Sequence, residues 1–271
     1  MGKEEEISKL RQIVKLHLEG DITDKTIPSW LPLTAPLIII LGIILFLFLP
    51  LFVPISCPYS MVLVITVTLY LTVIIGGLAS IAYPIYRLVK ARNEHLDRTG
   101  RMYILTSELL SQLGIGNPHE ILRKAEKIRS MSSRRSVKLY VGLALLTGPF
   151  SYYIYYLLNK DISTHSHLEK DFIDTVNSAI KKLHRVLQIN TNRLYVVGEK
   201  SLTKNIILTT LTFGAYSIYW LRNIIKDYNN HFKSHREVER QLIDYIKEAI
   251  TLEKEETKYL NINSNKRYSK Y

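Results

Sequence analysis

The segment TFGAYSIYWLRNIIKDYNNH, residues 212–231, organises this chain because it recurs upstream without a gap. A shift of 66 positions aligns Gly214, Ser217, Tyr219, Lys226, Asp227 and His231 with Gly148, Ser151, Tyr153, Lys160, Asp161 and His165. A fainter copy lies a further 70 positions upstream, where Tyr83, Tyr86, Lys90 and His95 match Tyr153, Tyr156, Lys160 and His165. The sequence therefore predicts an internal repeat.

A charged segment with regular apolar spacing follows each of the two clear copies. Its apolar residues step by four and three, which is typical of a helix that packs through a heptad seam. The seam residues are Phe172, Val176, Ala179 and Leu183 after the middle copy, and Val238, Leu242, Tyr245 and Ala249 after the last. We expect these helices to form a bundle within the chain or to pair with a second copy.

Two uncharged runs, residues 31–55 and 61–86, precede the two clear copies. Each exceeds the roughly 20 residues that a helix needs to cross the hydrocarbon of a bilayer. We therefore expect an all-α, polytopic integral membrane protein that begins with a transmembrane hairpin. The expected parts are an amphipathic helix (1–29), the hairpin (30–87), basic helices (88–138), repeat A (membrane element 139–158, helix 161–188, whole repeat 139–201), repeat B (membrane element 205–221, helix 223–258, whole repeat 202–258) and a polar tail (259–271).

Positive charge is concentrated on one side of the predicted hairpin. The net charge is +12, and residues 87–138 hold 12 Lys or Arg against 5 Asp or Glu. The positive-inside rule places this segment and both termini in the cytoplasm. Six cations are expected to contact anionic lipid headgroups: Arg123, Lys124, Lys127, Arg129, Arg134 and Arg135. Nucleic acid is the weaker alternative, because no aromatic residues alternate with these cations.

The two repeated apolar elements, residues 139–158 and 205–221, are short for membrane spans. Each is interrupted by a glycine, in TGP at 147–149 and in TFG at 212–214. The arms that remain have about nine residues, or roughly 13 Å of helix. Such arms favour re-entrant hairpins, which would keep both heptad helices on the cytoplasmic side. The alternative is four full spans, with the two heptad helices on opposite sides of the membrane.

The last copy carries a signature made of an Asn or Arg, an apolar run and TxGxYxxYW, represented by Asn205, Thr212, Gly214, Tyr216, Tyr219 and Trp220. This signature resembles that of a widespread prokaryotic family of uncharacterised small membrane domains. The resemblance implies a helical membrane module without an assigned activity. The middle copy departs from it, because Pro149 follows Thr147 and Gly148, and Ile154 replaces the Trp. Residues 4–23 resemble a short helical module that ends in GxIT and is associated with oligomerisation. A solvated or interfacial helix is the alternative.

The histidines raise the question of a metal site. His165, His167, His231 and His235 offer imidazole ligands, and a histidine recurs at equivalent positions 95, 165 and 231. No Cys accompanies them and the HExxH pattern is absent. We therefore expect polar residues at the membrane interface, where the repeated KDxxxH pattern orients the helices, and neither a metal nor a cofactor. The many tyrosines are expected to form an aromatic belt at the same level.

The sequence lacks the common motifs of enzymes, namely a glycine-rich phosphate loop, GxSxG and CxxC. The apolar runs contain no ionisable relay residue, which argues against ion-coupled transport. We expect a non-enzymatic scaffold or assembly protein of the cytoplasmic membrane that self-associates and shapes the membrane. The alternative is a small channel or transporter subunit that forms an oligomeric pore.

Overall fold

The computed structural model of the chain describes residues 2–52, 59–183 and 189–268, with side chains for residues 4–48, 60–181 and 189–251. Every regular element in these ranges is a helix, which confirms the predicted all-α class. The elements are α1 (Gly2–Thr23), η1 (Leu31–Leu33), α2 (Thr34–Phe52), α3 (Tyr59–Gln112), α4 (Pro118–Ser130), α5 (Val137–Leu146), α6 (Phe150–Leu183), η2 (Thr191–Arg193), α7 (Leu202–Leu211) and α8 (Ala215–Tyr268). Cys57 lies outside the described residues.

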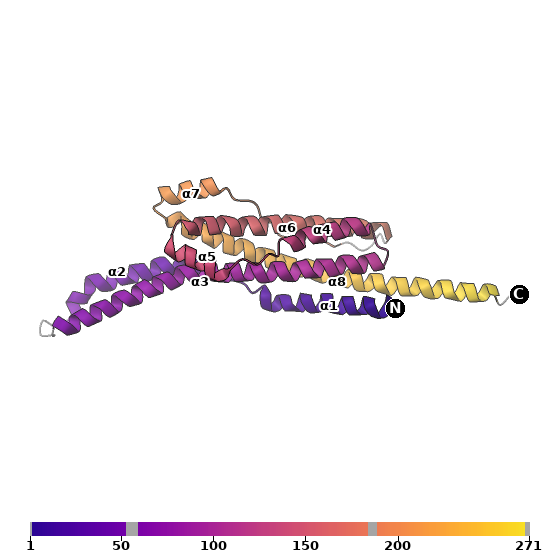
Figure 1. Cartoon of the computed structure of the whole chain (residues 1–271), viewed down its shortest axis with the longest axis horizontal. Coiled ribbons are helices and arrows are strands. Elements are labelled where there is room, and N and C mark those ends of the chain that lie inside the picture. The colour runs from indigo at the N-terminus through magenta and orange to yellow at the C-terminus, as the bar shows by residue number, and fades with distance from the viewer. Residues whose placement is uncertain (1, 53–58, 184–188, 269–271) are drawn as a thin grey trace.

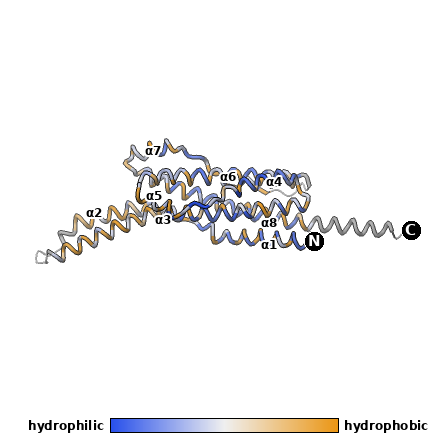
Figure 2. Tube along the Cα trace, in the orientation of Figure 1, coloured by the Kyte–Doolittle hydropathy of each residue, from blue (hydrophilic) through white to orange (hydrophobic). Residues whose placement is uncertain are grey.

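An apolar hairpin projects from one end of the molecule (Figure 1). It consists of α2 and the part of α3 that ends near Tyr86, and its side chains are mostly hydrophobic and exposed (Figure 2). Both helices are long and apolar enough to cross a membrane. Gly42 allows them to approach closely, because a Cβ atom there would come within 2.6 Å of Val73.

The second half of α3 forms a bundle with α6 and α8, and the three helices run in the same direction (Figure 1). α1 and α4 pack against this bundle. α6 and α8 pass through residues 158–161 and 221–223 without interruption, so no helix break marks the boundaries expected there between membrane element and heptad helix. The helical conformation of α8 also includes most of the expected polar tail. Composition changes at these positions, but no residue there breaks a helix.

Helix breaks do occur within both repeated elements, at residues 147–149 and 212–214. Ser136 caps α5 by accepting a hydrogen bond from the backbone of Leu139, and Ser201 caps α7 in the same way through Lys204. After α7 the chain turns through Phe213, with φ of 50°, and Gly214, with φ of 91°. α5 with α6 and α7 with α8 thus form two sharply turned helix pairs. We call α2, α3 up to Tyr86, α5, α7 and these two turns the apolar end.

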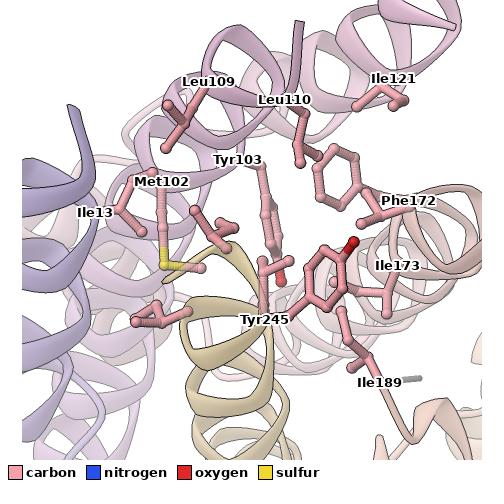
Figure 3. Close-up of a cluster of buried hydrophobic side chains, with 14 of the residues drawn as sticks. Ile13, Met102, Tyr103, Leu109, Leu110, Ile121, Phe172, Ile173, Ile189 and Tyr245 are labelled. Carbon is pink, nitrogen blue, oxygen red and sulfur yellow. The ribbon is translucent and has the colours of Figure 1, made fainter. Parts of the chain in front are cut away.

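The bundle has two apolar cores at different heights. The proximal core, next to the apolar end, contains Leu88 of α3, Leu158 of α6 and Ile224 of α8. The distal core joins α1, α3, α4, α6 and α8, and Figure 3 shows Ile13, Tyr103, Phe172 and Tyr245 meeting there. Seven of the expected seam residues lie in this distal core: Phe172, Val176, Ala179, Val238, Leu242, Tyr245 and Ala249. The side chain of Leu183 lies outside the described residues.

Candidate functional site

A layer of polar side chains separates the two apolar cores. It contains His95 of α3, His165 and Glu169 of α6, and His231, His235 and Glu239 of α8, all with an exposed fraction of 0%. We call these six residues the polar layer. Buried polar groups at this density need partners that satisfy their charge and hydrogen-bonding capacity.

The sequence builds this layer through helical spacing and through the repeat. His165 and Glu169 are four residues apart, as are His231, His235 and Glu239, so each set lies on one face of its helix. His95, His165 and His231 occupy equivalent positions in the three copies. Because α3, α6 and α8 run in the same direction, equivalent positions reach the same height, and the three imidazoles meet at the centre of the bundle.

Three histidines of the polar layer bring ligand atoms close together, and Glu169 lies beside two of them. Nε2 of His95 lies 3.2 Å from Nε2 of His165. Oε2 of Glu169 lies 3.4 Å from Nε2 of His231 and 3.8 Å from Nε2 of His165. The ligand atoms of the three histidines lie within 4.8 Å of one another. Three imidazole nitrogens and one carboxylate oxygen are suitable ligands for a divalent transition metal.

His235 takes a different role, because it stands between two carboxylates. Its Nδ1 bonds Oε1 of Glu169, and its Nε2 lies 2.6 Å from Oε1 of Glu239 without hydrogen-bond geometry. Both ring nitrogens therefore face negative charge, which favours the imidazolium form. His235 thus acts as a buried cation that pairs with both carboxylates and has no lone pair free for a metal.

Other charged groups surround the layer. Arg98 donates to Oε1 of Glu239 at 2.6 Å and to Asp24 at 2.5 Å. Asp24, just after α1, also contacts Nδ1 of His95 at 3.1 Å. Tyr103 donates to Oε1 of Glu169 at 2.5 Å. His17 contacts Oε2 of Glu239 at 2.9 Å. The layer therefore ties α1 to all three helices of the bundle.

The pKa values of the histidines separate them into two kinds. Burial lowers the pKa of His231 to about 4 and holds the pKa of His95 and His165 below the ordinary value, so these three rings are neutral. Burial alone would also lower the pKa of His235, but the carboxylates of Glu169 and Glu239 outweigh it and raise that pKa to about 10. The three neutral rings are those whose Nε2 atoms converge.

The pKa values of the acids follow from the same contacts. Burial would raise the pKa of Glu169 and of Glu239, but His235 outweighs it and lowers both. Burial would likewise raise the pKa of Asp24, but the hydrogen bond from His95 and the charge of Arg98 hold it well below its usual range. Burial next to Glu169 raises the pKa of Tyr103 well above its ordinary value, so the phenol remains a hydrogen-bond donor. All three carboxylates are therefore ionised at neutral pH.

The acidic residues of the KDxxxH pattern lie outside the layer and fix helices. Asp161 pairs with Arg92 at 2.9 Å and with Arg135 at 2.8 Å. Asp227 accepts hydrogen bonds from Lys200 and, at 3.1 Å, from Tyr195. Lys160 and Lys226 are exposed. The Asp of this pattern is thus structural, and its His belongs to the polar layer.

The TxGxYxxYW signature also has a structural explanation. Tyr216 donates its hydroxyl to Oδ1 of Asn205 at 3.1 Å, and its backbone N–H to the hydroxyl of Thr212 at 2.9 Å. Trp220 is buried in the proximal core against Tyr155. These contacts join α7 to α8 across the turn. Ser151 is also buried, Ser217 and Gly214 are partly exposed, and Thr147, Gly148, Tyr153 and Tyr219 are exposed at the apolar end.

The expectation that the recurring histidines lie at a membrane interface is wrong for His95, His165, His231 and His235, which are buried inside the bundle. His167 points outward. Sequence reasoning weighed the histidines of the layer but missed their carboxylate partners. The spacings HxxxE at 165–169 and HxxxHxxxE at 231–239 were the available signal, because they place imidazoles and carboxylates on one helix face.

The six cations expected at lipid headgroups are mostly engaged within the protein. Arg129 pairs with Asp97 at 2.8 Å, Lys124 with Asp171 at 2.7 Å, and Arg135 with Asp161. Arg134 reaches Asp97 at 3.8 Å, and Arg123 and Lys127 are exposed. Arg129 lies against Gly100, which is about 21 Å of helix beyond Tyr86. Headgroup contact by α4 therefore does not fit its position along the bundle.

A second candidate feature lies at the apolar end. An open pocket of about 600 Å³ lies where the two turns face the hairpin. Its lining includes Gly148 of one turn, Gly214 of the other, Ile39 of α2 and Leu78 of α3. Most of the lining residues are apolar. Because Ile39 and Leu78 are among them, the two turns reach at least as far along the hairpin as these two residues.

Comparisons of the chain with protein-family models, with curated proteins and with solved structures gave no match. The resemblance of residues 205–220 to a family of membrane domains therefore remains a prediction.

Proposed function

We propose that the chain is a non-enzymatic protein of the cytoplasmic membrane that shapes the bilayer by inserting more helix into one leaflet than into the other. The observation that carries this proposal is the unequal length of the helices at the apolar end. α2 has 19 residues, whereas α5 and α7 have 10 each. These lengths correspond to roughly 28 Å and 15 Å, close to the whole and half of a hydrocarbon core of about 30 Å.

The depth of the two turns supports this arrangement. They share a cavity with Ile39 and Leu78, which lie about 8 Å into α2 from Thr34 and about 12 Å into α3 from Tyr86. The turns thus end between about half and four-fifths of the way through one leaflet, which is roughly 15 Å thick. That leaflet contains α2, α3 and both helix pairs, and the opposite leaflet contains the hairpin alone. Such an asymmetric insertion expands one leaflet and favours curvature.

The exposed side chains fit this environment. Leu146 is 83% exposed, Leu211 70% and Phe213 fully exposed, and all three lie at or next to the turns. Exposed apolar groups of this size are costly in water and favourable in lipid. The rest of the bundle would remain in the cytoplasm with the amino terminus.

Two other expectations receive less support. The seam proposed for self-association is buried within one chain, so assembly with further copies would need another surface. In the pore alternative, the hydroxyls of α3 would face a water channel. Thr66, Thr68 and Thr72 instead donate to carbonyls of their own helix. Membrane shaping is therefore better supported than self-association through the seam or pore formation.

The test is reconstitution of the full chain into vesicles that contain anionic lipid, with vesicle diameter measured by electron cryomicroscopy and leakage measured with an entrapped dye. We expect smaller or tubulated vesicles without leakage. The double variant Leu146→Ser and Phe213→Ser should lose the effect. The control is Leu18→Ser with Ile22→Ser, which changes exposed apolar residues on α1. Unchanged diameters with the native chain, or solute-selective leakage, would contradict the proposal.

A further inference from the structure

The polar layer contains an arrangement that membrane shaping does not require. Nε2 of His95 lies against Nε2 of His165, and Oε2 of Glu169 lies near Nε2 of both His165 and His231, so groups from three different helices meet here. Oε2 of Glu169 and Nε2 of His231 have no hydrogen-bond partner within the described residues, although both are buried. Orphaned polar atoms inside a core are costly unless something else binds them.

We propose that His95, His165, His231 and Glu169 bind one divalent transition-metal ion, Zn²⁺ in the first instance, in a closed tetrahedral site. The distances support this geometry. Zn–N and Zn–O bonds of about 2.0–2.1 Å place the ligand atoms of a regular tetrahedron about 3.3–3.4 Å apart. Of the six separations between the ligand atoms, three are 3.2, 3.4 and 3.8 Å, and the three histidines each bring a ligand nitrogen within 4.8 Å of the other two.

The orientation of the imidazoles gives a second, independent argument. Nδ1 of His95 faces Oδ1 of Asp24 at 3.1 Å, and Nδ1 of His231 faces the backbone carbonyl of Tyr195 at 3.1 Å. A carboxylate and a carbonyl both accept a hydrogen bond, so each Nδ1 carries the proton and each Nε2 presents a lone pair to the centre. Metal-binding histidines are held in this way in other proteins. His165 lacks such a partner, because its Nδ1 is unpaired in the described structure.

The carboxylate ligand is held equally well. Oε1 of Glu169 accepts hydrogen bonds from Tyr103 and His235, which leaves Oε2 directed toward the three imidazoles. A second possible ligand group, Glu169 with His231 and His235, is less suitable because His235 pairs with two carboxylates. The assignment is therefore three histidines and one glutamate.

The charge of the layer favours a cation at this position. Asp24, Glu169 and Glu239 are buried carboxylates, and Arg98 is the buried arginine that pairs with two of them. His235 and Arg236, which lies 3.4 Å from Oε2 of Glu239, supply further positive charge, and Oε2 of Glu169 is left without a hydrogen-bond partner and can bind a cation. All four proposed ligands have an exposed fraction of 0%, so no coordination position faces solvent. A closed site with four protein ligands is typical of structural zinc.

The site would connect the three repeated units. His95, His165 and His231 each come from a different copy, and one ion would fix the relative heights of α3, α6 and α8. Metal binding would thereby stabilise the cytoplasmic bundle, and this role is independent of what the apolar end does in the bilayer.

The test measures the metal content of the purified full chain in detergent by inductively coupled plasma mass spectrometry. We expect one zinc ion per chain and a melting temperature that rises with Zn²⁺ and falls with chelator. After chelation, Co²⁺ should give the intense visible absorption of a tetrahedral site. Glu169→Gln should lower affinity at least about tenfold. The control is His167→Ala, which removes an exposed histidine two residues from His165 and should retain full metal content.

Loss of metal in a ligand variant could reflect misfolding, so a second variant is needed. His231→Cys replaces one ligand by another, and it should still bind Co²⁺ and add a sulfur-to-cobalt charge-transfer band in the near ultraviolet. The inference would be overturned by native protein without bound metal and without a tetrahedral Co²⁺ spectrum. It would also be overturned if His231→Cys bound Co²⁺ with an unchanged spectrum.

Discussion

Asp24 illustrates how one side chain outside the repeated helices controls the polar layer. It follows α1 in the chain, its side chain is 1% exposed, and it contacts both His95 and Arg98. Its carboxylate fixes the tautomer of His95 and balances the charge of Arg98. A residue in this position influences metal affinity without touching the metal.

Asp24→Asn should therefore weaken Zn²⁺ binding by about 10- to 100-fold, because the amide removes the negative charge beside His95. The measurement is competition for Zn²⁺ against a chelator of known affinity. Asp21→Asn is the matched control, since Asp21 lies three residues earlier, is largely exposed and pairs with Arg236. Equal affinity of the two variants would show that the contact between Asp24 and His95 has no influence on the site.

The histidines also predict how the stability of the metal-free protein depends on pH. An unfolded histidine has a pKa of about 6.5. Burial lowers the pKa of His231 to about 4 in the folded protein. Between these values the unfolded state binds more protons, so stability falls as the pH drops from 6.5 toward 4. Burial lowers the pKa of His95 and His165 as well, and both add to this loss.

His235 acts in the opposite direction. Burial would lower its pKa, but Glu169 and Glu239 raise it to about 10. Its contribution is present below pH 6.5 and is lost as the pH rises toward 10. Thermal unfolding in excess chelator should therefore show maximal stability near pH 6.5, with slopes of up to about 1.4 kcal/mol per pH unit for each group. His235→Gln should remove the alkaline slope. A native protein whose stability rose steadily from pH 6.5 to 10 would contradict this.

At the scale of the helices, the sequence predicted where helices end better than it predicted where a helix continues. Gly148 with Pro149, and Gly214, are local signals that act through backbone geometry, and the helices end there. The boundaries expected near residues 158–161 and 221–223 rested on a change from apolar to charged composition. Such a change alters the surroundings of a helix without interrupting its hydrogen bonds, so α6 and α8 continue through it.

The turn before α8 contains a strained residue whose cost can be measured. Phe213 has φ of 50°, which costs a residue with a side chain roughly 1–2 kcal/mol relative to glycine. Phe213→Gly should therefore be about 1 kcal/mol more stable than Phe213→Ala in detergent, because both remove the exposed ring and they differ in backbone freedom. Thermal unfolding compares the two variants. If the alanine variant were the more stable, the left-handed conformation would not be the native one.

A fully exposed aromatic ring at a strained position suggests selection for the ring itself. Both variants should therefore shape vesicles less than the native chain, although the glycine variant is the more stable of the two. At Phe213, the substitution that gives the more stable protein would thus still reduce membrane shaping.

At the scale of the whole molecule, the polar layer shows what a single sequence leaves hidden. The repeat identified His95, His165 and His231 as equivalent, but equivalence along the chain does not give the distance between residues 66 and 70 positions apart. That distance follows once the repeated helices run in the same direction around one axis. Asp24 and His17 reach the layer from α1 and the segment after it, which carry no copy of the repeat, so no pattern could have assigned them.

The path of α5 and α7 determines the side of the membrane on which the bundle lies. If α5 and α7 enter and leave from the same side, Lys181 of α6 lies on the side of α1. The sequence places Cys57 between the two long apolar runs, on the opposite side.

A membrane-impermeant maleimide should label Cys57 of the native chain from one face of sealed vesicles. It should label Lys181→Cys, in a Cys57→Ser background, from the other face. Leu18→Cys in the same background marks the side of α1, and both engineered cysteines should react from the same face. Labelling of Lys181→Cys from the face that exposes Cys57 would mean that residues 139–158 cross the bilayer completely. The helix added by the two short pairs would then no longer be confined to one leaflet, and the reason to expect curvature would disappear.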